Sequence, residues 1–431
     1  MKYVKVLCCI LTICLVFTGC NFSIASSIDD LLSPIAPFGD NASVQKTMDD
    51  YVKGTYNLKT PTYGEFITSY IFKDIDNDSV DEAICFYEPS DDLGSIYMAL
   101  LNKQKDNWAV ACSIKGNGKD IYSINFTDIN YDGNLEIIAC WDAISNSTTH
   151  NMSLYEFTND GGEYSIYQLD SGIAVNNYHF VDFNNDGKQE VFVLINDNTN
   201  SAAAKGQLYA INNSKFNLLG ETKLDGHITN YTKISSELVD GRVRIYADAI
   251  TSTGDSMLTE IVYWSDHYKN IIAPFYSYST GFTKGTNRNA MVNSLDIDND
   301  GIIEIPQDVS VEGLPQTVNM LDWKVLKNTV LVHDTYSLFV KDDSYLVLIP
   351  DDMFDKISVS YDNDSRTMSV NDVKQNNMLY SITPVLKSLY NEESYSGYEL
   401  IMENKGYYYL AKFGENSTID TQQLKDIIKS Y

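Results

Sequence analysis

Residues 74–82 of the chain read DIDNDSVDE, with acidic side chains at the first, third, fifth and ninth positions. Three later stretches repeat this pattern, namely DINYDGNLE from Asp128, DFNNDGKQE from Asp182 and DIDNDGIIE from Asp296. Each of the four has carboxylates or amides at positions one, three and five, and a glutamate at position nine. Because internal repeats reveal the unit from which a fold is built, this loop indicates a structure that the chain uses several times.

The spacing of the loops predicts the number of units. The first three loops begin 54 residues apart, but the step from Asp182 to Asp296 is 114 residues, or two units of 57. A unit without an acidic loop is therefore expected between them, near ELVDGRVRIYAD around Asp240. Short apolar runs flank the loops and predict strands, and about 50 residues leave room for the four strands of a propeller blade. We expect a mainly β protein in which residues 58–335 form a β-propeller of about five blades.

The residue types in the loop favour a hard cation. Oxygen ligands at positions one, three and five converge when the backbone curls around an ion, a backbone carbonyl is expected at position seven, and the acid at position nine closes the shell. Such an all-oxygen set suits calcium. An EF-hand or dockerin loop has its closing acid at position twelve, before a helix, and is excluded here. The residues at position twelve are Cys85, Ala139, Val193 and Gln307.

A closing acid at position nine before a strand resembles the calcium loop of FG-GAP and VCBS repeats, the propeller blades of integrin α-chains and many bacterial surface proteins. The resemblance implies DxDxDG calcium sites with these side-chain ligands: Asp74, Asp76, Asp78 and Glu82; Asp128, Asn130, Asp132 and Glu136; Asp182, Asn184, Asp186 and Glu190; Asp296, Asp298, Asp300 and Glu304. The expected carbonyl ligands belong to Val80, Asn134, Lys188 and Ile302.

Position six of the loop needs a sharp turn. Glycine permits such a turn and is present as Gly133, Gly187 and Gly301. The first loop has Ser79 instead, so we expect a more strained turn and weaker binding there. A solvated acidic turn without metal is the alternative, since Asp, Asn and Gly are ordinary turn residues.

The N-terminus predicts export and membrane anchoring. Lys2 and Lys5 precede an apolar run over residues 6–17, which is shorter than the roughly 20 residues that span a bilayer and suits a signal peptide. The run ends in FTGC, which resembles a bacterial lipobox, although Phe17 stands where leucine is usual. The resemblance implies that residues 1–20 are the signal peptide and lipobox, and that Cys20 carries acyl chains, palmitate among them, which anchor the protein to the membrane. A plain secretory signal peptide is the alternative.

Two further segments flank the expected propeller. Residues 21–57 predict a tether and a short helix that Ser43 caps, with Val44, Met48, Tyr51 and Val52 on its packing face. Residues 336–431 predict a small α+β domain with a hairpin turning at residues 404–406. Its last helix is expected to begin with a capping box of Asp420 and Gln423. The buried stripe of that helix should contain Leu424, Ile427, Ile428 and Tyr431.

Charge and cysteine content exclude some classes of protein. With 31 basic and 59 acidic residues the formal net charge is −28, so the surface repels phosphate backbones and nucleic acid is not expected as a partner. Cys85, Cys112 and Cys140 follow the signal segment, and three cysteines cannot form a complete disulfide framework. We expect buried free thiols, with a single pair that includes Cys112 as the alternative.

The sequence contains no recognisable catalytic motif. Its five histidines lack metal-ligand spacing, and there is no G-x-S-x-G, P-loop or G-x-G-x-x-G. The whole chain resembles VCBS-repeat lipoproteins of Firmicutes, a resemblance that implies no particular activity. We expect an extracytoplasmic calcium-binding protein that binds an envelope protein or glycan. The alternatives are a secreted glycan lyase or hydrolase with its active site in the propeller funnel, and a sensory or assembly ectodomain.

Overall fold

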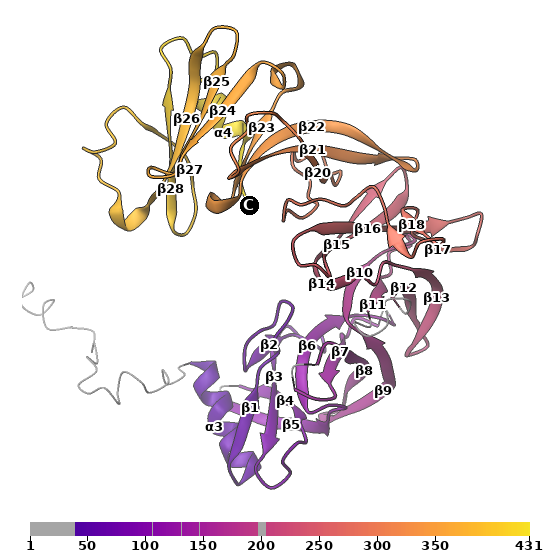
Figure 1. Ribbon diagram of the computed structural model, residues 1–431. Helices are drawn as coiled ribbons and strands as arrows, with labels where there is room; N and C mark the ends of the chain where they lie inside the picture. The colour runs from indigo at the N-terminus through magenta and orange to yellow at the C-terminus, as the bar shows by residue number, and fades with distance from the viewer. Residues whose placement is uncertain (1–38, 106, 131, 146, 197–203) are drawn as a thin grey trace, which may run out of the picture.

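The computed structural model describes residues 39–105, 107–130, 132–145, 147–196 and 204–431 (Figure 1). The expected signal peptide, Cys20 and the tether as far as residue 38 lie outside the described residues. No helix in the described ranges is both long and apolar enough to cross a membrane.

The described chain is mainly β and forms several antiparallel sheets of four or five strands. It begins with helix α3 (Asp40–Val52) and later contains helix α4 (Thr421–Ile427). The first sheet contains β1 (Tyr56–Lys59), β2 (Ile71–Lys73), β3 (Glu82–Pro89), β4 (Tyr97–Gln104) and β5 (Asn107–Lys115). The second contains β6 (Asp120–Thr127), β7 (Glu136–Asp142), β8 (His150–Asp160) and β9 (Glu163–Val175). The third contains β10 (Asn177–Val181), β11 (Glu190–Ile195), β12 (Lys205–Asn212) and β13 (Lys215–Lys223).

Three more sheets follow the same antiparallel plan. The fourth contains β14 (Ile228–Val239), β15 (Arg242–Thr251), β16 (Met257–Ser265) and β17 (Asn270–Ile272), and the small hairpin of β18 (Tyr276–Ser277) and β19 (Phe282–Thr283) comes after it. The fifth contains β20 (Ile305–Val309), β21 (Val318–Lys327), β22 (Val330–Val340), β23 (Tyr345–Ile349) and β29 (Ile428–Ser430). The sixth contains β24 (Ile357–Asp362), β25 (Thr367–Asp372), β26 (Asn377–Leu386), β27 (Glu399–Glu403) and β28 (Tyr407–Phe413).

The four acidic stretches are hairpin loops of the same register. We name them loop 1 (74–82), loop 2 (128–136), loop 3 (182–190) and loop 4 (296–304). In each loop the residue before position one pairs with the glutamate at position nine. These pairs are Lys73 with Glu82, Thr127 with Glu136, Val181 with Glu190, and Leu295 with Glu304.

The fourth sheet is the unit that was expected without an acidic loop. Its strands β14 and β15 are joined by a tight turn at Asp240 and Gly241, whose φ angles are 52° and 72°. Two residues in this left-handed region are typical of the tight turns that join hairpin strands. The 114-residue step between loops 3 and 4 therefore contains one complete four-stranded sheet, as the spacing predicts.

Consecutive sheets pack face to face, which explains the wholly apolar strand sequences. In β7, Trp141 points to the first sheet and contacts Phe86 with a ring separation of 5.6 Å, while its neighbour Cys140 packs toward the third sheet with Val193. Strands buried on both faces lose the alternation of polar and apolar residues. The apolar runs after loops 1, 2 and 3 thus mark strands that lie between two neighbouring layers.

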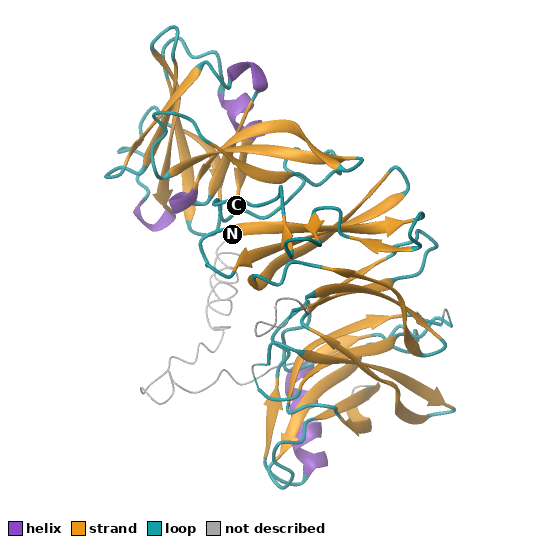
Figure 2. Cartoon of the chain, turned by 45° about the vertical axis from the view of Figure 1, so that its right-hand side comes forward, coloured by secondary structure: helices purple, strands orange, loops and turns teal. Residues whose placement is uncertain are grey.

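The outer face of the first sheet is covered by α3. Val44 and Met48 of the helix are fully buried against Cys85 and neighbouring side chains of that sheet. Figures 1 and 2 show the sheets following one another along an arc that begins at α3, with the sixth sheet at the other end. In the part of the chain that the structure describes, the face that would meet a last blade in a closed ring is occupied by the helix.

Helix α3 differs from the prediction at its N-terminus. It begins at Asp40, and the residue before it is Gly39, so Ser43 is not its cap; the Ser43 hydroxyl instead donates to the Gly39 carbonyl at 3.3 Å. Val44 and Met48 are buried as predicted, but Tyr51 is 45% exposed and does not belong to the packing face. A serine in the first turn of a helix can donate its hydroxyl to the carbonyl four residues earlier. Ser43 does so, and Gly39 therefore occupies the cap position.

The end of the chain joins the fifth sheet. The capping box of Asp420 and Gln423 is present at the start of α4, as predicted. The helix stops at Ile427, however, and Ile428 opens β29, which pairs with β23. The expected division at residues 335 and 336 falls inside β22, and the fifth and sixth sheets share one apolar core.

Candidate metal centres

Loop 4 brings three carboxylates together above a buried glutamate. The carboxylates of Asp296, Asp298 and Asp300 each offer an oxygen within 4.8 Å of the others. Asp296 accepts hydrogen bonds from the backbone N–H groups of Asp300 at 3.0 Å and Gly301 at 2.9 Å, which curls the loop. Glu304 is fully buried, and its Oε2 accepts from the backbone N–H of Ile297 at 2.9 Å. This is the arrangement that the spacing of the acids predicts.

Loop 1 repeats this geometry in the first sheet. The carboxylates of Asp74, Asp76 and Asp78 converge within the same 4.8 Å, and Glu82 Oε2 accepts from the Ile75 N–H at 2.9 Å. Asp74 accepts from the backbone N–H groups at positions five and six, at 3.2 and 3.0 Å. Loops 1 and 4 therefore share both the carboxylate cluster and the buried closing glutamate.

Loops 2 and 3 differ because asparagine occupies their third position. The amide of Asn130 donates to Glu136 Oε1 at 3.2 Å, and the amide of Asn184 donates to Glu190 Oε1 at 3.3 Å. Each amide also donates to the carboxylate at position five, at 3.0 and 3.1 Å. The closing glutamates of these loops thus have a protein donor for each oxygen, since their Oε2 atoms accept from the Ile129 and Phe183 N–H groups.

The closing glutamates of loops 1 and 4 have no such donor. Glu82 Oε1 and Glu304 Oε1 are buried without a hydrogen-bond partner among the described residues, and so is Asp76 Oδ1. A buried carboxylate oxygen without a donor is costly. Burial, aided by repulsion from the nearby aspartates, raises the pKa of Glu82 to about 7 and that of Glu304 to about 8. A cation between these oxygens would supply the missing partner, so the residues of loops 1 and 4 fit a divalent metal ion such as calcium.

The residues at position seven of the four loops make the same backbone hydrogen bond. The backbone N–H at position seven donates to the position-five side chain at 2.8 Å in every loop, and the four donors belong to Val80, Asn134, Lys188 and Ile302. Whether their carbonyls are ligands stays a prediction.

Ser79 at position six of loop 1 has a φ of 70°, in the left-handed region. The glycines at this position have φ between 87° and 95°. A side chain in this region is strained by about 1–2 kcal/mol, which supports the expectation that loop 1 has the more strained turn.

A buried guanidinium from the segment after β19 contacts the fourth sheet. The side chains of Arg288 and Asp248 are both fully buried and form an ion pair at 2.7 Å. Asp248 Oδ2 also accepts from the backbone N–H of Ser294 at 2.8 Å, in the segment that leads into loop 4. An internal cation therefore neutralises this carboxylate and ties the fourth sheet to the next one. The sequence did not predict this pair, because its two members are 40 residues apart.

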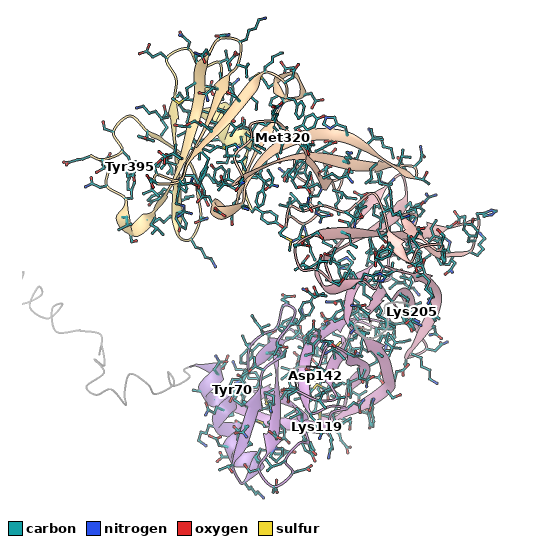
Figure 3. All side chains as sticks on the ribbon, viewed as in Figure 1. Tyr70, Lys119, Asp142, Lys205, Met320 and Tyr395 are labelled. Carbon is teal, nitrogen blue, oxygen red and sulfur yellow. The ribbon has the colours of Figure 1, made fainter. Side chains whose placement is uncertain are left out.

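A second pair that the sequence did not predict joins His150 to Asp142. His150 Nδ1 hydrogen-bonds Asp142 Oδ1, both side chains are buried, and the ring of Tyr122 stacks on the imidazole with centroids 3.5 Å apart. Burial lowers the pKa of His150, against the opposing effect of Asp142. The pair lies at the end of β7 and the start of β8, the end of the second sheet away from loop 2, and Figure 3 labels Asp142.

The three cysteines after the signal segment, Cys85, Cys112 and Cys140, are free thiols, as expected. Burial raises the pKa of each thiol to about 12, so none is a reactive thiolate at neutral pH.

Comparison with models of known protein families gives no match for this chain, and comparison with curated protein sequences gives none either. The structure therefore supports a mainly β protein of several antiparallel sheets with two clusters of three aspartates that could hold a metal ion.

Proposed function

We propose that this chain is a calcium-binding, propeller-like lipoprotein of the VCBS and FG-GAP type, anchored to the outside of the cell membrane through Cys20. The observation that carries the calcium site is a pair of buried glutamate oxygens, Glu82 Oε1 and Glu304 Oε1, which have no donor in the described part of the chain and lie beside converging aspartates. Bound calcium would neutralise these carboxylates. The chain's own contribution is to hold the ligands in a loop of fixed register, so that the ion would fix the β2–β3 hairpin in loop 1 and the bridge of Leu295 to Glu304 in loop 4.

We propose further that the sheets present a binding surface to a protein or glycan of the cell envelope. An enzyme would be favoured by carboxylates clustered in an open site outside the loops. Four carboxylates outside the loops, Asp225, Glu237, Asp248 and Glu260, are instead buried and hydrogen-bonded inside the fourth sheet and its neighbours. Their environment supports a structural role, and a binding protein accounts better for the described residues than a hydrolase or lyase does.

Sedimentation with isolated cell envelopes tests the binding role. The full chain in detergent should sediment with envelopes in calcium, and less in chelator. An Asp298→Asn, Asp300→Asn double variant should show part of this loss in calcium, because loop 1 stays intact, whereas Glu312→Gln, at an exposed position, should behave like the parent. Protease treatment of the envelopes distinguishes a protein partner from a glycan. Equal sedimentation of parent and double variant under all conditions would contradict the proposal.

The anchoring is tested separately by Cys20→Ser. The variant should be released from membranes or remain unprocessed, since a single cysteine carries the proposed acyl chains. Membrane fractionation and N-terminal sequencing give the answer. A variant that fractionates like the parent and has the same mature N-terminus would contradict the lipid anchor.

A further inference from the structure

The sixth sheet carries a groove that the acidic loops do not explain. It has a volume of about 650 Å³, within the range of about 300–1,000 Å³ that small-ligand sites occupy. In β25, Met368 and Val370 face the core that the fifth and sixth sheets share, so the alternate residues Thr367 and Ser369 face away from it and line the groove. Part of the connection between β26 and β27 forms the other wall, and Figure 3 labels Tyr395 in that connection.

Uncharged hydroxyl groups line one wall of the groove. The Ser365 hydroxyl donates to Thr367 Oγ1 at 2.9 Å, and Thr367 Oγ1 lies 2.8 Å from Thr383 Oγ1. Ser360 and Ser369 add two more hydroxyls to the lining. Hydroxyls both donate and accept hydrogen bonds, so this surface matches a ligand that carries many hydroxyls of its own.

Tyrosine rings form the apolar part of the groove. Tyr395, Tyr398 and Tyr407 line it and are partly exposed. Tyr395 is held edge-on to Tyr398 at 5.6 Å and stacks on Tyr390 at 5.9 Å. Rings that are fixed by their neighbours lose little conformational entropy on binding. They offer flat apolar faces together with a polar hydroxyl, which suits the C–H faces and hydroxyl edges of a sugar ring.

The charged residues that line the groove are mainly acidic, while Lys412, outside the lining, has its Nζ 5.8 Å from the centroid of the Tyr398 ring. Arg366 is the one cationic residue in the lining, and its guanidinium is already paired with the fully buried carboxylate of Asp343. Asp362 and Asp364 are exposed lining residues and can accept hydrogen bonds from ligand hydroxyls. Since the whole chain has a formal net charge of −28, long-range repulsion also acts against anions.

We propose that this groove binds a neutral oligosaccharide, with Tyr395 and Tyr398 as stacking platforms and the hydroxyls of Thr367, Ser369 and Thr383 as hydrogen-bonding partners. The proposal rests on the proposed binding function, for which it specifies the class of ligand and the location of the binding site. It does not depend on calcium, because the sixth sheet contains none of the four acidic loops.

A printed array of neutral and anionic glycans, probed with the full chain in detergent, is the first test. Retention on neutral glycans supports the proposal. A blank array, or retention on anionic glycans only, would overturn it, as would a preference for a lysine-rich peptide over the best neutral glycan.

Calorimetry with the best neutral glycan then compares the affinities of variants. Tyr395→Ala and Tyr398→Ala should each weaken binding at least tenfold, and Thr367→Val should weaken it severalfold by removing one hydroxyl.

Tyr278→Ala is the matched control, since Tyr278 is 76% exposed, follows β18 and lies outside the groove. It should leave the affinity unchanged. Equal affinity in the parent and both groove tyrosine variants would overturn the proposal.

Envelope sedimentation distinguishes a failure of this proposal from a failure of the proposed function. If the protein sediments with envelopes in a calcium-dependent way but the array is blank, the groove proposal is wrong and the proposed envelope binding stands. If the groove binds glycans but the protein does not sediment, only the proposed envelope partner is wrong.

Discussion

Aspartate and asparagine at the third position of the acidic loops have opposite consequences for the closing glutamate. The amides of Asn130 and Asn184 donate to that glutamate, so loops 2 and 3 have an internal donor. Asp76 and Asp298 cannot donate, and one glutamate oxygen in each of loops 1 and 4 is buried without a partner among the residues that the structure describes. We therefore expect loops 1 and 4 to depend most on a bound cation.

Glu304→Gln should raise the stability of the metal-free protein and remove the stabilisation that calcium provides at loop 4. At a pH above the raised pKa of Glu304, about 8, the neutral amide removes a buried charge and can donate to the neighbouring aspartates. The metal-free variant should therefore be more stable than the metal-free parent, by about 1–3 kcal/mol. In calcium it should lose the stabilisation that loop 4 provides. Denaturant unfolding in chelator and in calcium measures both effects, with Glu312→Gln as an exposed control. A variant less stable than the parent in chelator would contradict this account.

Ser79→Gly should stabilise the protein and strengthen calcium binding in loop 1. The φ of Ser79 is 70°, a conformation that glycine adopts without strain, so about 1 kcal/mol of stability is expected. Gly301→Ser is the reverse change in loop 4, where an added Cβ meets nothing within 4 Å and the effect is purely conformational. Thermal unfolding should therefore shift in opposite directions for the two variants. Shifts in the same direction would show that the backbone conformation is not the cause.

Glu260 should make stability depend on pH even when calcium is saturating. Burial raises its pKa from an ordinary value near 4.5 to about 7, and it accepts from the Asp225 N–H and the Thr283 hydroxyl. Because the folded state holds this proton more tightly than the unfolded state, the stabilisation is complete below the ordinary pKa and is lost as the pH rises through about 7. The free energy of unfolding should fall across that window. Glu260→Gln should flatten the fall, and an equally steep fall in the variant would refute the assignment.

At the scale of single elements, helix α3 replaces a neighbouring sheet as the cover of the first sheet. Met48 is fully buried in that contact, whereas Tyr51 on the same helix is 45% exposed. Met48→Ala should therefore reduce the free energy of unfolding by about 2–5 kcal/mol through the cavity it leaves. Tyr51→Ala should change it by no more than about 0.5 kcal/mol. Denaturant unfolding of both variants is the measurement, and similar losses in the two would mean that the helix does not pack as described.

The elements that the sequence predicts well are those with strong local signals. The acidic loops, the strands around them and the capping box of Asp420 and Gln423 all follow from residues that are close together in the chain. The start of α3 was missed because Gly39 carries no side-chain signal for a cap. The end of α4 was missed because Ile428 continues the helical apolar stripe, and only its pairing with Val347 of β23 makes it a strand residue.

At the scale of the whole molecule, the repeat spacing predicts the repeated sheets, but it does not predict what covers the first sheet or which strands complete the fifth. Nothing local in the sequence indicates that α3 covers the first sheet, or that β23 and β29 extend the fifth. The pairs of Arg288 with Asp248 and of His150 with Asp142 also depend on the tertiary fold, because spacing along the chain does not identify such partners. The groove of the sixth sheet has the same origin, since its tyrosines and hydroxyls come from separate strands and a connection.

Calorimetric titration of calcium into the metal-free full chain, followed by thermal unfolding, tests the central claim most directly. The account predicts saturable calcium binding with a rise in melting temperature, since a ligand that binds only the folded state stabilises it. Magnesium should replace calcium poorly, because it requires tighter octahedral geometry. Asp300→Ala should remove one site, and Asp78→Ala should matter less because Ser79 strains loop 1. No binding heat at millimolar calcium, with an unchanged melting temperature, would contradict the account and leave the four loops as acidic turns.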